Sequence, residues 1–131
     1  MTQALPWIAI VDDDPSVLKA LARLLRSRAF EARTYTSARD FLGALTEGLP
    51  ECLIVDLQMP EMSGLELQQH LSRRGIEIPT IVITAHGDVQ ARERCECAGA
   101  IAFLKKPLQE TTLFAAIQKA SRAARTGDGP H

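Results

Sequence analysis

Acidic residues directly follow two short apolar runs of the sequence. Asp12 and Asp13 come after the run WIAIV, and Asp56 comes after the run CLIV. Carboxylates that gather in one place repel one another and need a compensating cation. Mg²⁺ is one such cation, because it accepts oxygen ligands and commonly uses one or two carboxylates together with a phosphate oxygen. The ammonium group of a lysine is a second candidate. Which cation compensates the carboxylates depends on which side chains the fold brings together.

Two further apolar runs end in groups that can bind an anion. The run TIVIT ends in Thr84, and Ala85 behind it offers a backbone N–H. The run IAFL is followed by Lys105 and Lys106. Because side chains alternate along a strand, only one of these two lysines can point into the same crevice. Four apolar runs therefore each deliver a polar group at their carboxyl end.

The apolar runs alternate with amphipathic stretches, which predicts an α/β fold. Residues 7–11, 52–55, 80–84 and 101–104 have the pattern of strands buried on both faces, and the segment 30–35 alternates as an edge strand does. Five βα units with right-handed crossovers give a flavodoxin-like, doubly wound parallel sheet with strand order 2-1-3-4-5. Strands 1 and 3 are neighbours in that order, so we expect the three carboxylates to meet in one crevice.

Helical patterns fill the segments between the strands. The first helix starts behind an Asp14 cap, and the second starts behind a Ser37 cap. The others are expected over residues 64–73, 88–98 and around 113–120. The fourth helix carries few apolar residues on any one face, so we expect it to be loosely held.

Length and composition exclude several classes of protein. The 131 residues suffice for one domain, expected over residues 1–125 with a flexible tail over 126–131. The formal net charge of −1 argues against binding nucleic acid or a membrane surface by bulk charge. No apolar run approaches the roughly 20 residues of a membrane helix, and the three cysteines give no disulfide framework. We therefore expect a cytoplasmic protein that contacts neither nucleic acid nor membrane through this chain.

Four motifs together resemble a known family. They are IVDDD, LIVDLQMPEMSGLEL, IVITAHGD and AGAIAFLKKP, and with them the sequence resembles the receiver domain of two-component response regulators over about residues 5–124. The segments DLQMPEMSG and ITAHGDV are most similar to the nitrogen-fixation regulator (FixJ-like) subfamily. Members of that subfamily usually carry a second, DNA-binding domain for transcription regulation, which these motifs do not include.

The resemblance implies a role for each acidic residue. Asp56 matches the phospho-acceptor, Asp13 matches the direct Mg²⁺ ligand, and Asp12 matches the neighbour that holds a metal-bound water. The backbone carbonyl of Gln58 matches the third protein ligand. The implied partner is a sensor histidine kinase that presents a phosphohistidine. Because a carboxylate is ionised at neutral pH, Asp56 would attack the phosphorus without a general base.

The resemblance also implies a conformational switch. Thr84, the Ala85 N–H and Lys106 match the groups that bind the phosphoryl group, so Lys105 is expected to face solvent. Thr84 and Phe103 match the switch residues, of which the first moves toward the new charge and the second turns inward. The surface of the fourth helix, fifth strand and fifth helix would then change for a homodimer or another partner. The peptide bond from Lys106 to the following proline is usually cis in the family.

Two other classes of function stay open at this point. One is a Mg²⁺-dependent phosphatase with an aspartate nucleophile, because residues 12–14 offer a DxD pattern, although 131 residues leave no room for the cap such enzymes need. The other is a receiver-like scaffold that never accepts phosphate, against which the acidic set and Lys106 count. We predict a phosphorelay receiver domain that is no enzyme beyond catalysing its own phosphorylation and slow dephosphorylation.

Overall fold

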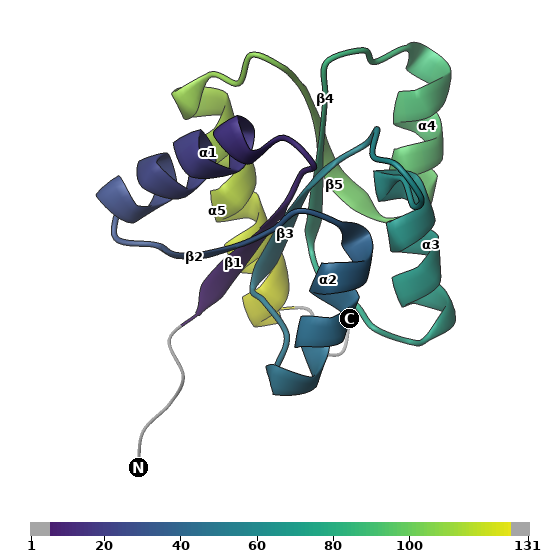
Figure 1. Ribbon diagram of the computed structural model, residues 1–131, viewed down its shortest axis with the longest axis horizontal. Helices are drawn as coiled ribbons and strands as arrows, with labels where there is room; N and C mark the ends of the chain where they lie inside the picture. The colour runs from purple at the N-terminus through teal and green to yellow at the C-terminus, as the bar shows by residue number, and fades with distance from the viewer. Residues whose placement is uncertain (1–5, 127–131) are drawn as a thin grey trace.

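Five parallel strands form one sheet in the order β2-β1-β3-β4-β5 in the computed structural model, which describes residues 6–126 (Figure 1). The strands are β1 (Trp7–Val11), β2 (Glu31–Tyr35), β3 (Cys52–Asp56), β4 (Thr80–Thr84) and β5 (Ala100–Lys105). The helices are α1 (Pro15–Ser27), α2 (Ala38–Ala44), the short 3-10 helix η1 (Leu45–Glu47), α3 (Gly64–Arg73), α4 (Val89–Cys97) and α5 (Glu110–Thr126). The fold class and the strand order predicted from the sequence are confirmed.

The helices cover both faces of the sheet, as a doubly wound fold requires. On one face the buried side chains of α1 and α5, such as Leu25 and Ile117, pack against Ile8 and Ile54 of the sheet. On the other face α2, α3 and α4 lie over the sheet, with Phe41 of α2 among the fully buried side chains (Figure 1). The sheet is therefore buried on both sides, which explains why its central strands are continuous apolar runs.

The register of the sheet brings the carboxyl ends of the central strands level with one another. Val11 of β1 pairs with Val55 of β3, and Asp56 pairs with Ile83 of β4. Thr84 in turn lies opposite Lys105 of β5. The residues that follow these pairs therefore emerge at one edge of the sheet.

Polar caps fix the starts of the helices. Asp14 is the N-cap of α1 and accepts a hydrogen bond from the Ser16 N–H at 2.9 Å, as predicted. Ser37 caps α2 in the same way. At α3, Ser63 and Glu66 form a reciprocal capping box. These caps set where each helix leaves the loop behind a strand end.

Element ends differ from the sequence-based expectation by single residues in the sheet and by more in α5. β3 includes Asp56 because that residue still pairs with β4, and β5 is one residue longer at each end than expected. α5 runs from Glu110 to Thr126, beyond the expected region around 113–120. The apolar pattern marks only the positions that face the sheet, so it underestimates a helix whose ends are polar. Residues 127–131 of the expected tail lie outside the described residues.

Helix α4 has little apolar contact with the rest of the domain. Cys95 is the one α4 residue that is buried in the described structure, and Val89 is 72% exposed. A side-chain hydrogen bond also reaches α4, from Gln68 Nε2 of α3 to the Cys95 carbonyl at 3.2 Å. The thin apolar face expected from the sequence is therefore present.

None of the helices in the described part of the chain is both long and apolar enough to cross a membrane.

Candidate functional site

Three carboxylates gather at the carboxyl ends of β1 and β3. Asp12 is completely buried, Asp56 is 6% exposed, and Asp13 is exposed to solvent. One carboxylate oxygen from each lies within 4.8 Å of the others. The sequence predicted this meeting from strand order alone, and the structure brings the three side chains together.

Lys106 supplies the positive charge inside this cluster. Its Nζ lies 2.9 Å from Asp12 Oδ2 and 3.5 Å from Asp56 Oδ2, and its side chain is 22% exposed. The neighbouring Lys105 is exposed, so the alternation along β5 selects Lys106. The Lys106 N–H donates to the Thr84 carbonyl at 2.7 Å, which joins the ends of β4 and β5. The peptide bond after Lys106 is cis.

The charges in the cluster shift one another's protonation. Burial raises the pKa of Asp56, and the charge of Asp12 raises it further, while Lys106 only partly offsets both effects. Burial works against the charge of Lys106, but the hydrogen bond and charge of Asp12 outweigh it, so the pKa of Lys106 is raised. The site therefore favours the charged form of Lys106 and disfavours the charged form of Asp56.

The loop behind β3 turns tightly to present Asp56. The Gln58 N–H donates to Asp56 Oδ1 at 3.3 Å, and the Gly64 N–H donates to the Leu57 carbonyl at 2.9 Å. A Cβ at Gly64 would lie 2.7 Å from the backbone oxygen of Asp56, which leaves no room for any side chain. The motifs of the sequence do not mark Gly64 as part of the site. The available signal was a glycine at the first position of a helix, where other residues form helix better.

The end of β4 carries the predicted hydroxyl. Thr84 is buried, and its Oγ1 donates to the His86 carbonyl at 2.9 Å and accepts from the His86 N–H at 3.0 Å. Ala85 and Gln58 are exposed at the same rim. Phe103 of β5 is half-buried and packs at the margin of the core cluster under α3 and α4. All the predicted site residues except Phe103 therefore lie at or beside the carboxyl end of the sheet.

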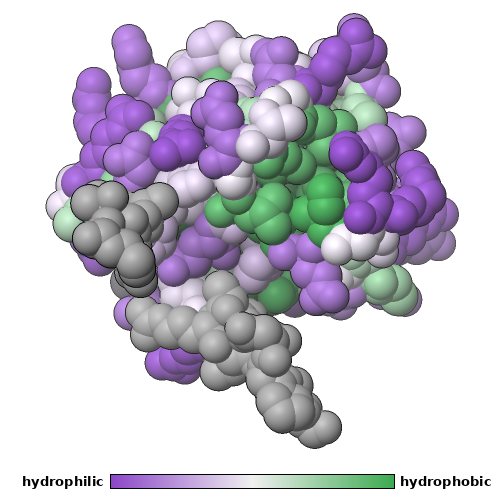
Figure 2. Space-filling model, turned by 90° about the horizontal axis from the view of Figure 1, so that it is seen from below, coloured by the Kyte–Doolittle hydropathy of each residue, from purple (hydrophilic) through white to green (hydrophobic). Residues whose placement is uncertain are grey.

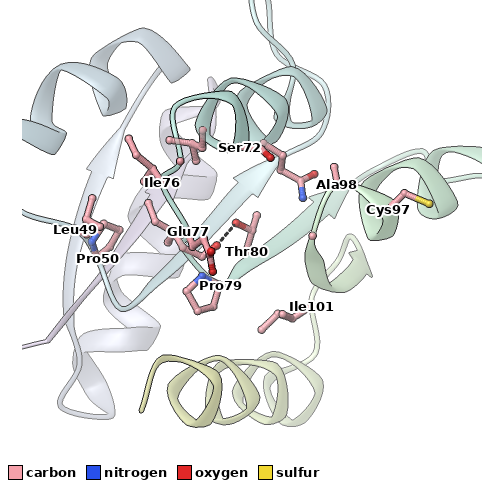
Figure 3. Close-up of a pocket in the computed structure, with 15 residues that line it drawn as sticks. Leu49, Pro50, Ser72, Ile76, Glu77, Pro79, Thr80, Cys97, Ala98 and Ile101 are labelled. Carbon is pink, nitrogen blue, oxygen red and sulfur yellow. Dashed lines mark hydrogen bonds between the residues drawn. The ribbon is translucent and has the colours of Figure 1, made fainter. Parts of the chain in front are cut away.

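A large hollow lies at the opposite end of the sheet. It measures about 930 Å³ and is lined in part by the segment that leads into β4 and by the end of α4. Apolar side chains gather on this face (Figure 2), and Figure 3 shows Leu49 and Pro50 across the hollow from Ala98 and Cys97. The acidic group of Asp12, Asp13 and Asp56 takes no part in it. The volume of a hollow therefore does not identify the chemical site in this protein. The gathering of charged side chains identifies it.

A sequence profile for the response regulator receiver domain matches residues 8–118. The chain belongs to this family. The response regulator protein TmoT of Ectopseudomonas mendocina is 44% identical over 117 residues, which are 89% of this chain and 53% of TmoT. The transcriptional regulatory protein FixJ of Rhizobium meliloti is 41% identical over 114 residues, which are 87% of this chain and 56% of FixJ. This receiver domain thus spans about half the length of these curated relatives.

Solved structures agree with the assignment. The crystal structure of FixJ-N matches this receiver domain with a TM-score of 0.83 at 40% identity, covering 92% of this chain and 96% of that one. The signal receiver domain of a putative Luxo repressor protein from Vibrio parahaemolyticus, at 24% identity and a TM-score of 0.89, shows the same fold. The FixJ-like character predicted from the motifs is confirmed. The chain is a receiver domain of the two-component type, a module of phosphorelay signalling.

Proposed function

We propose that Asp56 accepts a phosphoryl group from a sensor histidine kinase with the help of Mg²⁺. The observation that carries this proposal is the position of Lys106, whose ammonium lies within reach of both Asp12 and Asp56 at the edge of the sheet. Such an arrangement holds one carboxylate oxygen ready for attack beside a fixed positive charge. Positioning and electrostatics are what phosphoryl transfer demands of a protein.

The donor set of the acidic cluster fits Mg²⁺. All its groups are hard oxygen donors, which suit a small divalent cation. Asp12 Oδ1 accepts from the Asp14 N–H and Oδ2 accepts from Lys106, each at 2.9 Å, whereas the two donors to Asp56 lie farther away, at 3.3 and 3.5 Å. Asp13 is exposed and free to approach an ion directly. Asp13, Asp56 and the Gln58 carbonyl would therefore bind the ion, with Asp12 acting through water. Bound Mg²⁺ would neutralise charge on the phosphoryl oxygens.

The transfer itself needs no general base. A carboxylate oxygen of Asp56 forms a bond to phosphorus while the bond from phosphorus to the kinase histidine nitrogen breaks, and that nitrogen keeps the electron pair. Lys106, the Thr84 hydroxyl and the Ala85 N–H stabilise the charge on the transferring oxygens. Water later attacks the acyl phosphate, which releases inorganic phosphate and restores the Asp56 carboxylate. The chain acts on itself and turns over no separate substrate.

Phosphorylation would then change the surface formed by α4, β5 and α5. To reach the phosphoryl group, the Thr84 hydroxyl must leave the His86 carbonyl to which it now donates. The new charge of about −1.5 to −2 draws it away. Phe103 and the thinly packed α4 lie next to that movement, so their surface is suited to exchange one packing for another. We propose that a homodimer or a partner protein reads this surface.

Intact-mass measurement after treatment with acetyl phosphate and Mg²⁺ tests the proposal. We expect a gain of one phosphoryl group that is lost with EDTA and lost in Asp56→Asn. Asp40→Asn, an exposed aspartate in α2, serves as the control and should still gain the group. No gain in the wild-type chain would support the scaffold alternative. Continuous release of phosphate from a phosphomonoester would support the phosphatase alternative.

A further inference from the structure

Gly87 lies where the loop behind β4 meets the ring of Phe103. A Cβ placed on Gly87 would lie 2.8 Å from Phe103 Cε1 and 3.2 Å from Cζ, and 3.0 Å from Thr84 Cγ2. Real Cβ atoms do not approach neighbours this closely without displacing them. The missing side chain of Gly87 therefore forms a slot that the edge of the Phe103 ring and the Thr84 methyl group share.

Space is the reason for glycine at this position, because backbone conformation does not require it. Among the described glycines, positive φ angles occur at Gly48, Gly75 and Gly99. Gly87 has no such angle, so an alanine could adopt its backbone without strain. The atoms nearest to a Cβ at Gly87 belong to Phe103 and Thr84.

Thr84 and Phe103 are linked through this slot. The Thr84 hydroxyl is held by two hydrogen bonds to the His86 backbone, which leaves its methyl group on the side of Gly87. A rotation of the Thr84 side chain that releases the hydroxyl also moves the methyl group from its place beside Gly87. The ring has a second place to go, because Phe103 also lines a hollow of about 200 Å³ between the end of β5 and the start of α5.

We propose that Gly87 is a positioning residue of the switch, whose open slot lets the Phe103 ring respond to the position of Thr84. This inference rests on the proposed function, because it assigns the contact through which phosphorylation at Asp56 would reach β5. A methyl group in the slot displaces the ring, since the ring end is the mobile partner and Thr84 is held by its two hydrogen bonds. In Gly87→Ala the ring stays displaced whether or not Asp56 is phosphorylated.

Fluorine NMR of protein labelled with 4-fluorophenylalanine tests this directly. The chain contains four phenylalanines, so the spectrum has four resonances, and Phe103→Leu identifies the one that belongs to Phe103. Beryllofluoride with Mg²⁺ mimics the phosphoryl group. We expect it to shift the wild-type Phe103 resonance. In Gly87→Ala we expect that resonance to be displaced before any addition and its beryllofluoride response to be lost, while acetyl phosphate still adds a phosphoryl group by mass.

Gly43→Ala is the matched control, because a Cβ at Gly43 would meet nothing within 4 Å. It should leave the Phe103 resonance and its response unchanged. A Gly87→Ala protein with the wild-type resonance and response overturns the inference. If the wild-type chain gains no phosphoryl group, the proposed function fails, and the ligand-free displacement of the resonance still decides the contact between Gly87 and Phe103.

A double-mutant cycle covers the case in which Gly87→Ala folds poorly. Shortening the side chain by Phe103→Leu removes Cε1 and Cζ, the two ring atoms that the new methyl group would meet, and leaves the contact with Thr84 Cγ2. The stability lost in Gly87→Ala should therefore be largely recovered in the double variant, as expected of residues in direct contact. Additive losses in the double variant would overturn the inference.

Discussion

Replacing Asp56 with asparagine should stabilise the fold in the absence of divalent cations. At an effective dielectric constant of 20, a lysine 3.5 Å away attracts the Asp56 charge by about 4.7 kcal/mol. A carboxylate up to 4.8 Å away repels that charge by about 3.5 kcal/mol or more, and both Asp12 and Asp13 lie within that distance. The terms from Lys106 and Asp12 nearly cancel, so burial and the screened repulsion from Asp13 decide the sign. Removing the charge should therefore raise the free energy of unfolding by about 1 kcal/mol, the upper end of what a solvent-exposed charge such as that of Asp13 contributes.

The stabilising effect of Asp56→Asn depends on pH. The pKa of Asp56 is raised above its ordinary value of 3.8, so the folded state holds the Asp56 proton to higher pH than the unfolded state does. The contribution of Asp56 to the unfolding free energy of the wild-type chain accordingly falls as pH rises through 3.8 toward the raised pKa of the folded state. The advantage of Asp56→Asn is complete above both pKa values, and it disappears well below 3.8, where both states are protonated.

Urea denaturation followed by circular dichroism measures this advantage. Wild type, Asp56→Asn and the control Glu93→Gln, which removes an exposed carboxylate of α4, are compared in EDTA at neutral and acidic pH. Saturating Mg²⁺ should reverse the order, because an ion at 100 times its Kd adds about 2.7 kcal/mol to the folded wild-type chain and binds the uncharged variant more weakly. An Asp56→Asn chain that is less stable than wild type in EDTA at neutral pH would refute the electrostatic account.

Three further variants or probes test other parts of the structure. Gly64→Ala should lower the free energy of unfolding in urea by about 1–3 kcal/mol, because the new Cβ would lie 2.7 Å from the backbone oxygen of Asp56. An unchanged free energy of unfolding would contradict this close contact. Gln68→Leu should change the free energy of unfolding by less than about 1 kcal/mol, because the buried Oε1 of Gln68 accepts no hydrogen bond in the described chain. It should nevertheless speed amide hydrogen exchange in α4, because it removes the hydrogen bond to the Cys95 carbonyl, whereas the exposed control Gln69→Leu should not. Equal exchange rates in the two variants would contradict the role of this hydrogen bond. At mildly alkaline pH, the exposed Cys97 should react with a thiol reagent well before Cys52, because burial raises the pKa of the Cys52 thiol to about 12. Equal reaction rates measured by mass spectrometry would show that Cys52 is accessible.

The sequence was sufficient to predict how the acidic site is assembled, because strand order determines it. Once β1 and β3 are neighbours, residues at their carboxyl ends must lie together, and Asp12 meets Asp56 without further information. The selection of Lys106 over Lys105 needed only the alternation of side chains along a strand and the family resemblance. Helix starts followed from capping residues such as Asp14 and Ser37 for the same reason, since each cap acts within a few residues.

Contacts between distant segments could not be predicted in this way. The sequence marked Gly64 and Gly87 only as glycines, because their importance comes from a backbone oxygen and a ring that approach them in the folded chain. The hydrogen bond from Gln68 to the Cys95 carbonyl likewise joins two helices whose spacing depends on the packing of the whole layer. The ends of α5 were missed because polar terminal turns carry no apolar period.

The most direct test of the central claim is to locate the phosphoryl group on the chain. After acetyl phosphate and Mg²⁺, borohydride reduces an aspartyl phosphate to homoserine, which peptide mass spectrometry identifies by position. We expect homoserine at position 56, dependent on Mg²⁺ and greatly reduced in Lys106→Met. Homoserine at Asp12 or Asp13, or none at any position, would contradict it.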